Sequence, residues 1–345
     1  STIAKKEKID WANRKLEFEK IVKHVKSKKR LYDCVIPVSG GKDSTWQVIK
    51  ALEYNLNPLC VTWKTPSRND LGKSNLKNLI NLGVNHIDFT INPNVEKLFT
   101  LKAFKKFGNP LIPMHMALHA IPLQIAVNFK IPLILWGENS AFEYGGDETL
   151  MGDILNHKWL NKYGVTNETS SEDWIDEDLN SEYLSPYQWP SDERQKNAGV
   201  KAVFMGYFFH WDPLITYKIS KKYGFKPANK PKTGFYNYAD IDDSFLITVH
   251  HWMKWYKFGF TRLWDNLSIE IRNGRMSRDD AIILIKKYGN ENPDNEINLF
   301  CDYLGISKVE FFKIASGFRN NKIWSKNKDG IWYIKNFLIN DWIWN

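Results

Sequence analysis

Six residues near the start of the chain, Ser39-Gly40-Gly41-Lys42-Asp43-Ser44, constrain its fold more than any other stretch. They follow an apolar, β-rich run over residues 32–38, which predicts a buried strand, and they open a helical pattern over residues 44–54. Glycines at such a turn let the backbone approach a ligand closely, because no Cβ intervenes. The helix directs its free N–H groups and its positive dipole end into the same space. This order predicts an anion site, with phosphate as the expected anion.

The turn does not have the usual P-loop pattern, in which a glycine is followed by four residues and then by Gly-Lys-Ser/Thr. Gly72-Lys73-Ser74 is the only Gly-Lys-Ser in the chain, and Ser67 stands where the first glycine would be. Ser-Gly-Gly-x-Asp-Ser after a first strand instead resembles the PP-loop of the ATP pyrophosphatases. The resemblance implies that ATP binds here and is cleaved between its α and β phosphates. A glycine turn of purely structural use is the alternative.

Strand and helix patterns alternate over the next part of the chain. The expected strands cover residues 32–38, 58–63, 86–91, 131–136 and 200–208, and the expected helices 44–54, 71–82, 95–107 and 115–129. This alternation predicts an α/β fold with a twisted parallel sheet and helices on both faces, of the Rossmann-like type. Ligands bind such sheets at the carboxyl ends of the strands. Candidate nucleotide-binding residues therefore lie at three strand ends: Val38 with Ser39, Gly40, Gly41, Lys42, Asp43 and Ser44; Thr62 with Trp63; and Gly137.

Three regions are expected along the chain. Residues 1–30 form an amphipathic helix, residues 31–212 the ATP pyrophosphatase domain, and residues 213–345 an α-helical domain that ends in short strands or turns. An insertion at 138–199 interrupts the second region. Residues 138–194 hold 14 Asp and Glu against 3 Lys and Arg, so this stretch carries −11 and the remainder +20. We interpret the insertion as a lid or a partner surface, with a disordered acidic excursion over 165–182 as the alternative.

Composition narrows the class of protein. The net charge of +9 fits either nucleic acid or anionic small molecules, but there is no basic–aromatic RNA motif. No apolar run approaches the roughly 18 residues of a membrane span, and no signal peptide pattern opens the chain. Cys34, Cys60 and Cys301 are far apart, with no Cys-x-x-Cys. We expect a cytoplasmic protein with no membrane contact.

The stretch 137–147 combines carboxylates, an amide and glycines after a strand at the ligand edge. Glu138 or Glu143 can bind the Mg²⁺ that ATP chemistry needs, and Asp43 is a further candidate ligand. Asn139 and Tyr144 can hydrogen-bond a sugar or a nucleotide. Alternatively, Glu138 caps the next segment and the glycines form a turn.

Two further sets of residues can carry chemistry. His115 and His119 lie four apart on an expected helix, as a metal pair would, but a core helix is the favoured interpretation because no third ligand is evident. Four basic residues of the helical region can bind phosphate or carboxylate groups: Lys257, Arg262, Arg272 and Arg275.

Together these segments resemble the N-acetyl sugar amidotransferases, the PP-loop enzymes of bacterial surface-polysaccharide (lipopolysaccharide O-antigen) and flagellin-sugar pathways. The resemblance covers residues 31–290 or so. Its marks include residues 39–44, 131–139, 143–146, 205–213, 257–260 and 271–275. Many family members carry an N-terminal cysteine-rich segment expected to bind zinc, which is missing from this sequence.

The resemblance implies that an acetamido oxygen attacks the α-phosphate of ATP and that ammonia then displaces AMP, giving an acetamidino sugar. The implied catalytic residues are Lys42, Asp43, Ser44, Glu138 and Asn139, with Asp43 and Glu138 on Mg²⁺; the implied substrate residues are Glu143, Tyr144, Lys257, Arg262, Arg272 and Arg275. No cysteine has a catalytic setting, so the ammonia is expected from outside the chain, and the resemblance implies a separate glutaminase and a cyclase-like channel subunit. A PP-loop tRNA-modifying enzyme and a non-catalytic partner-binding protein remain as alternatives.

Overall fold

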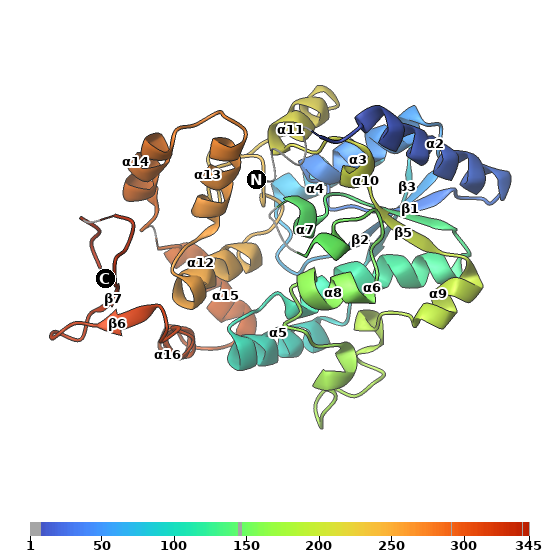
Figure 1. Cartoon of the computed structure of the whole chain (residues 1–345). Coiled ribbons are helices and arrows are strands. Elements are labelled where there is room, and N and C mark those ends of the chain that lie inside the picture. Colours follow the sequence, from blue (N-terminus) through green and yellow to red (C-terminus); the bar gives the residue numbers. More distant parts are fainter. Residues whose placement is uncertain (1–7, 144–146, 291, 340, 345) are drawn as a thin grey trace. The chain divides into compact units, whose positions relative to one another are not determined.

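The computed structural model describes residues 8–143, 147–290, 292–339 and 341–344 (Figure 1). These residues form two compact units. The first takes the described residues up to Phe99 together with Ile112–Pro227, and the second takes Thr100–Leu111 together with the residues from Ala228 onward. Tyr144 and its two following glycines lie outside the described residues.

A parallel five-stranded sheet is the centre of the first unit, with strand order β3-β2-β1-β4-β5. The strands are β1 (Cys34–Pro37), β2 (Pro58–Trp63), β3 (Asn85–Phe89), β4 (Leu133–Trp136) and β5 (Lys201–Phe204). Val35 of the central strand pairs with Leu59 on one side and Ile134 on the other. The order along the sheet therefore reverses at β1, which makes the carboxyl end of β1 the switch point where ligands bind in such folds. The predicted α/β class is confirmed.

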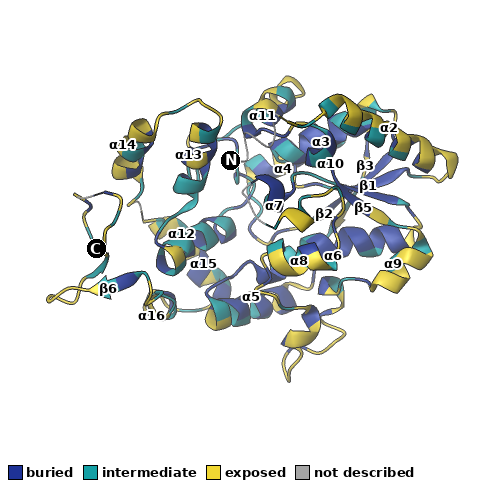
Figure 2. Ribbon diagram, in the orientation of Figure 1, coloured by how far each residue is buried: buried dark blue, intermediate teal, exposed yellow. Residues whose placement is uncertain are grey.

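Helices cover both faces of this sheet, with α3 (Lys42–Glu53) and α4 (Asp70–Ile80) on one face and α6 (Ile112–Asn128) on the other. Helix α5 (Pro93–Phe107) precedes α6 and continues into the second unit. Cys34, Ile36 and Cys60 belong to one core cluster with Trp46 of α3 and Leu79 of α4. Helix α6 contacts β1, β2 and β4 from the other face (Figure 1). Strands β1, β2 and β4 are thus buried on both sides, as Figure 2 shows in dark blue, which explains why their sequences are continuous apolar runs, whereas the edge strand β3 is partly exposed.

The N-terminal helix α2 (Trp11–Ser27) begins at Asp10, whose side chain accepts a hydrogen bond from the amide of Asn13 at 2.9 Å. Its apolar stripe of Phe18, Val22 and Val25 is buried in the same core cluster as α3 and α4. The predicted packing of this helix on the α/β domain is therefore observed. Exposed basic residues follow on its last turn and beyond, as expected for a solvated helix end.

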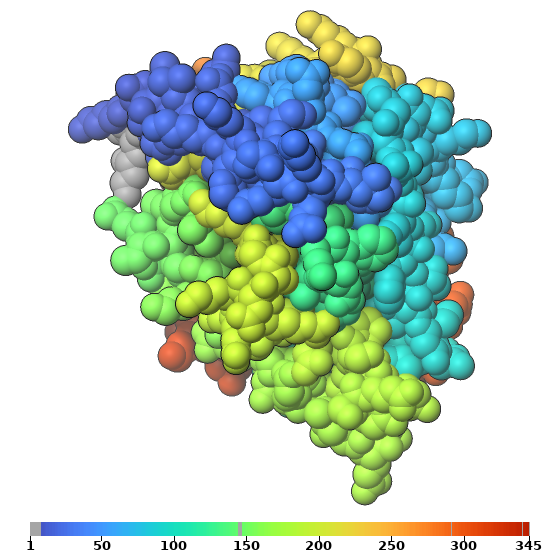
Figure 3. Space-filling model, turned by 90° about the vertical axis from the view of Figure 1, so that its right-hand side faces the viewer, coloured from blue at the N-terminus to red at the C-terminus, as the bar shows by residue number. Residues whose placement is uncertain are grey.

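The insertion contains short elements: α7 (Ser140–Glu143), η1 (Glu148–Leu150), α8 (His157–Tyr163), η2 (Ser171–Trp174), η3 (Ser185–Tyr187) and α9 (Asp192–Ala198). Trp174, Leu179 and Tyr187 are buried, and the rings of Trp174 and Tyr187 pack on Phe99. The segment 165–182 is thus anchored by side chains, which does not support a disordered excursion. Figure 3 shows this part of the first unit, in yellow-green, as a projection at the bottom of the view.

One sequence prediction at the end of the sheet is wrong. The apolar run 200–208 was expected to be one strand, but β5 stops at Phe204 and α10 (Met205–Phe208) follows directly. A short apolar run fits a buried strand and a buried helix equally well. The close approach of Gly206 to Glu138 occurs in this turn: a Cβ on Gly206 would lie 3.3 Å from the Cα of Glu138.

The second unit is helical, as predicted. Its helices are α12 (Leu246–Phe258), α13 (Arg262–Arg272), α14 (Arg278–Tyr288), α15 (Asp294–Leu304) and α16 (Lys308–Gly317), followed by the antiparallel pair β6 (Trp324–Lys326) and β7 (Trp332–Ile334). Leu263, Leu267, Ile285 and Trp342 form part of one core. The last turns of α5 supply Phe104, whose ring packs on Phe300 and Phe311.

The compact units differ from the predicted domain boundaries in two places. Helix α11 (Pro213–Lys222), which the sequence assigned to the helical domain, packs on α3 within the first unit. The segment Thr100–Leu111 joins the second unit although it lies far upstream. The domain boundaries themselves stay a prediction. No helix of the described residues is both long and apolar enough to cross a membrane.

Candidate active site

The glycine turn connects the carboxyl end of β1 to α3, where the sequence placed it. Gly40 has a φ of +86°, and a Cβ there would lie 2.5 Å from the backbone nitrogen of Leu76 and 2.7 Å from its Cα. No side chain can be accommodated at such distances. Gly40 is therefore required both by its own backbone conformation and by the close approach of α4.

Gly41 is the N-cap of α3 and, having no side chain, caps none of the first-turn amides. These amides and the positive end of the helix dipole provide the electrostatics of an anion site. The hydroxyl of Ser39 accepts a hydrogen bond from the amide of Gly41 at 3.2 Å, so its own hydrogen stays available. Ser44, in contrast, is buried and donates to the carbonyl of Gly41 at 3.1 Å. In this conformation Ser39 is the better placed of the two predicted hydroxyl donors.

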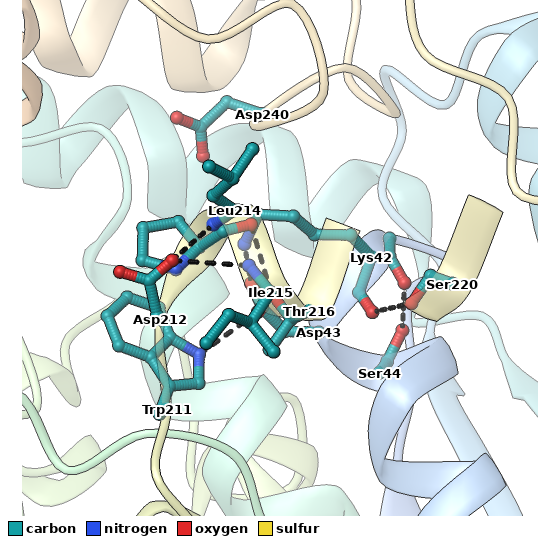
Figure 4. Close-up of polar contacts among 12 residues, drawn as sticks. Lys42, Asp43, Ser44, Trp211, Asp212, Leu214, Ile215, Thr216, Ser220 and Asp240 are labelled. Carbon is teal, nitrogen blue, oxygen red and sulfur yellow. Dashed lines mark hydrogen bonds and ion pairs between the residues drawn. The ribbon is translucent and has the colours of Figure 1, made fainter. Parts of the chain in front are cut away.

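Lys42 and Asp43 form an ion pair in the first turn of α3 (Figure 4). The Lys42 side chain is only 5% exposed and its Nζ lies 5.6 Å from the centroid of the Trp211 ring, whereas the Asp43 side chain is 31% exposed. A buried ammonium group needs such a partner because its desolvation is costly. The second oxygen of Asp43, Oδ1, accepts from Nε1 of Trp211 at 3.0 Å and from Oγ1 of Thr216 at 2.9 Å.

A corner at Asp212-Pro213 holds these donors in place. The Asp212 side chain caps α11 by accepting from the amides of Leu214 and Ile215 at 2.9 and 3.2 Å. Farther along α11, the hydroxyl of Ser220 donates to the backbone carbonyl of Lys42 at 2.6 Å. Figure 4 shows Trp211, Thr216 and Ser220 directed at the first turn of α3. The first turn of α3 is therefore held at two points, the Asp43 carboxylate and the Lys42 carbonyl. The donors come from α11 and from the residue Trp211 just before it.

Thr62 and Trp63 lie at the carboxyl end of β2. Thr62 is buried and donates to the carbonyl of Val38 at 2.6 Å, with Nε2 of His86 at 2.8 Å, so its hydroxyl holds neighbouring strand ends together. Trp63 is half-buried and donates from Nε1 to Oε1 of Glu96 at 2.7 Å. Burial raises the pKa of Glu96 to about 8, although the indole hydrogen bond opposes this. The orientation of the Trp63 ring is thus fixed by a buried carboxyl group that the sequence analysis did not identify.

Gly137 and Glu138 follow β4 at the same edge of the sheet. A Cβ on Gly137 would lie 3.1 Å from Nε2 of the buried Gln47, and its carbonyl accepts from the amide of Gly206 at 2.9 Å. Glu138 is half-buried, while Glu143 is buried at the end of α7. The structure therefore leaves Glu138 as the more accessible of the two predicted carboxylates.

Asn139 is 2% exposed, and its amide makes four hydrogen bonds. Nδ2 donates to the carbonyls of Leu150 and Gly152, and Oδ1 accepts from the Ala141 amide and from Nε1 of Trp159. This is the full capacity of the group. Asn139 therefore has no amide atom left for the predicted contact with a sugar or nucleotide. We interpret it as the residue that fastens the insertion to the end of β4.

His119 is a core residue, in agreement with the favoured interpretation. Its Nδ1 lies 2.6 Å from the carbonyl of His115, and its ring stacks on Trp136 at 4.8 Å. Burial lowers the pKa of His119 to about 3. Among the described residues, no group of three or more His, Cys, Asp or Glu side chains is placed to hold a metal ion.

Mg²⁺ typically binds to one or two carboxylates and completes its coordination with phosphate oxygens and water. Asp43 and Glu138 fit that pattern. Asp43 has three donors on about four lone-pair positions, which leaves one for a cation. Glu138 is half-buried at the ligand edge. These are the residues that would hold the ion.

The four basic residues among the predicted substrate residues lie in the second unit, where each of them has a partner. Lys257 donates to the carbonyls of Phe107 and Gly108 at 3.2 and 3.4 Å, and burial lowers its pKa to about 8. Arg262 lies 3.5 Å from Asp240. Arg275 makes a two-pronged ion pair with Glu270, which also accepts from Tyr236, and Arg272 donates to the carbonyl of Ser268. Binding an anion at these positions would require exchanging existing contacts.

Sequence reasoning missed Trp211, Thr216, Ser220 and Glu96. The first three are more than 160 positions from their partners in the glycine turn, and no local pattern signals such a contact. The Asp-Pro pair at 212–213 was available as a helix start signal, because Asp caps a helix and Pro suits its first position. That signal identifies α11 but not what it packs against.

The fold and this turn define the class of protein: an α/β protein with a glycine turn that opens a helix at the switch point of its sheet. More particularly, residues 218–338 match the family described as LPS biosynthesis protein WbpG-like, C-terminal domain. This match, which is limited to the C-terminal region, supports the resemblance that the sequence indicated.

Comparison with solved structures gives a weaker likeness. NMN synthetase from Francisella tularensis is 13% identical and covers 65% of this chain and 99% of its own, with a TM-score of 0.29. A superposition of this quality supports no argument about function. No curated protein matches the chain at a significant level.

Proposed function

We propose that the protein is an AMP-forming amidotransferase that converts the acetamido group of a nucleotide-linked sugar to an acetamidino group. The observation that supports this proposal most strongly is the turn at 39–44. Contact with Leu76 excludes any side chain at Gly40, and Gly41 leaves the first-turn amides of α3 uncapped. The match to an LPS biosynthesis family supports a sugar as the substrate class. A cytoplasmic location is part of the same proposal.

The turn would bind the phosphates of ATP through backbone amides, with Ser39 adding a hydroxyl donor. Lys42 supplies the positive charge that stabilises the departing pyrophosphate, as preorganised donors and charges do wherever negative charge develops. When bound, Mg²⁺ would neutralise phosphate charge further. The acetamido oxygen forms a bond to the α-phosphorus while the bond to the β-phosphate oxygen breaks. No protein nucleophile is needed in this step.

The second step needs ammonia, which adds to the activated carbon as AMP leaves with the original oxygen and a proton is lost. The described thiols are poor candidates for releasing ammonia from glutamine. Burial raises the pKa of the Cys34 thiol, raises that of Cys60 to about 12, and also raises that of Cys301. A reactive thiolate requires the opposite setting. We therefore include a separate glutaminase in the proposal, together with the cyclase-like channel subunit that the family resemblance implies.

The test is incubation of the full chain with ATP, Mg²⁺, ammonium and a panel of N-acetylated nucleotide sugars, followed by mass spectrometry. AMP, pyrophosphate and an acetamidino sugar are expected together. ADP and phosphate as sugar-dependent products would refute the proposal. Glutamine should replace ammonium only when a glutaminase is added.

Variants of the turn make the same test sharper. Asp43→Ala and Ser44→Ala should each lower turnover by roughly tenfold or more, because Asp43 holds the charge of Lys42 in place and the Ser44 hydroxyl holds the Gly41 carbonyl of the turn. Thr45→Val is the matched control on the next position of α3. Thr45 is 1% exposed, and its hydroxyl has no hydrogen-bond partner among the described residues. Activity of both turn variants at the level of the control would contradict the assignment.

A further inference from the structure

The ion pair of Lys42 and Asp43 is not held by the turn alone. Asp43 meets Lys42 with one oxygen, and its other oxygen receives two hydrogen bonds from outside α3 (Figure 4). A carboxylate fixed at one oxygen by two donors cannot rotate freely about its last torsion. These two hydrogen bonds to Oδ1 therefore fix the direction in which Asp43 presents Oδ2 to Lys42.

We infer that Trp211 and Thr216 are positioning residues of the phosphate turn: they orient Asp43 so that it holds the Lys42 ammonium in place to receive phosphate. This inference rests on the proposed function, because it takes ATP as the ligand. Neither residue needs to touch the nucleotide.

The burial of these groups supports such a role. Thr216 is fully buried and Trp211 is 4% exposed, so their donors are directed into the protein and not toward solvent. The Thr216 hydroxyl has one hydrogen, and its 2.9 Å contact with Asp43 is shorter than its 3.2 Å contact with the carbonyl of Pro213. The face of Trp211 also lies 5.6 Å from Nζ of Lys42, so one side chain contacts both members of the ion pair.

The geometry also separates orientation from simple packing. Ser220 lies on the same helix, is fully buried like Thr216, and also donates to the first turn of α3. Its acceptor, however, is the backbone carbonyl of Lys42 and not the carboxylate of Asp43. Thr216 and Ser220 are thus a matched pair: both fasten α11 to α3, but only Thr216 acts on the side chain of Asp43.

The experiment is a double-mutant cycle read by calorimetric binding of inorganic pyrophosphate and of ATP with Mg²⁺, which needs no sugar. Thr216→Val keeps the shape and removes the hydroxyl, and we expect it to weaken binding roughly tenfold, as loss of a hydrogen bond to a charged group does. Trp211→Phe should have an effect in the same direction. In an Asp43→Ala background, Thr216→Val should have no further effect, whereas Ser220→Ala should cost the same in both backgrounds.

Two controls guard against a general effect of the substitutions. Thr45→Val removes a buried hydroxyl, and Trp342→Phe removes a buried indole N–H; neither group has a hydrogen-bond partner among the described residues. Both should bind pyrophosphate as wild type does. If Thr216→Val binds like wild type, or loses as much affinity with Asp43→Ala as without it, the positioning role is wrong. If wild type binds neither pyrophosphate nor ATP, the proposed function fails as well, which is a different result.

Steady-state kinetics give a second readout. A misplaced Lys42 loses charge stabilisation as pyrophosphate departs, so kcat of Thr216→Val should fall more than KM for ATP rises. Thr216→Ser keeps the hydroxyl and should restore most of kcat. A variant that loses thermal stability but keeps kcat would show that Thr216 is only a packing residue.

Discussion

Replacing Gly40 by alanine tests whether the turn is dictated by the approach of α4. Two costs follow from the structure. The φ of +86° lies in the left-handed region, which costs an L residue about 1–2 kcal/mol. The added Cβ would also lie 2.5 Å from the nitrogen of Leu76, and displacing a packed backbone costs about 1–3 kcal/mol more. We therefore expect the free energy of unfolding to fall by about 2–5 kcal/mol.

Two other glycines separate these costs. Gly83 has a φ of +99°, but a Cβ added there would have nothing within 4 Å, so Gly83→Ala should show the conformational cost alone. Gly41 has a φ of −68°, and a Cβ there would lie 3.2 Å from the Ser39 hydroxyl oxygen, so Gly41→Ala should cost least. Urea denaturation of the three variants, followed by circular dichroism, gives the comparison. Equal losses for Gly40→Ala and Gly83→Ala would refute the argument from close approach.

Three further predictions concern buried polar groups. The pKa of Glu96 is raised from 4.5 to about 8, so the stabilisation that its protonated form gives the folded state is lost as the pH rises through that interval. Glu96→Gln should remove this part of the pH dependence of the free energy of unfolding. The pKa of His119 is lowered from 6.5 to about 3, so its contribution is present above pH 6.5 and lost on acidification; an NMR titration should find its ring neutral at about pH 5 and above. Asn139→Ala leaves four partners unpaired and should make residues 147–165 cleave faster in limited proteolysis, with unchanged cleavage arguing against its fastening role.

Local patterns predicted the elements of the sheet well. β2 spans the predicted residues 58–63, and α3 begins at Lys42, two residues before the prediction, because the helix starts directly after its glycine cap. Periodicity and glycine positions carry this information, since they reflect the local choice between strand, turn and helix. The apolar run 200–208 shows where such patterns fail. A segment that is buried on all sides has no alternation of polar and apolar residues that would distinguish a strand from a helix.

Side-chain partners across the fold could not be predicted in the same way. The sequence identified Asp43 and Asn139 as residues with functional chemistry, but whether their polar atoms are available depends on distant residues. Trp211 is 168 positions from Asp43, and Trp159 is 20 positions from Asn139. A sequence pattern shows which atoms a residue has, whereas only the packed structure shows which of them are already used.

The discontinuous second unit has a consequence for biosynthesis. Its upstream piece, Thr100–Leu111, leaves the ribosome long before the helices that cover it. Phe104 is completely buried against Phe300 and Phe311, so the nascent chain must keep this ring solvent-exposed, or shielded by a chaperone, until α15 and α16 have been made. A fragment beginning at Ala228 would, conversely, expose the two phenylalanine rings that Phe104 covers. Expression of the C-terminal region by itself should therefore yield aggregates unless the upstream segment is supplied, for instance as a fused or co-expressed peptide.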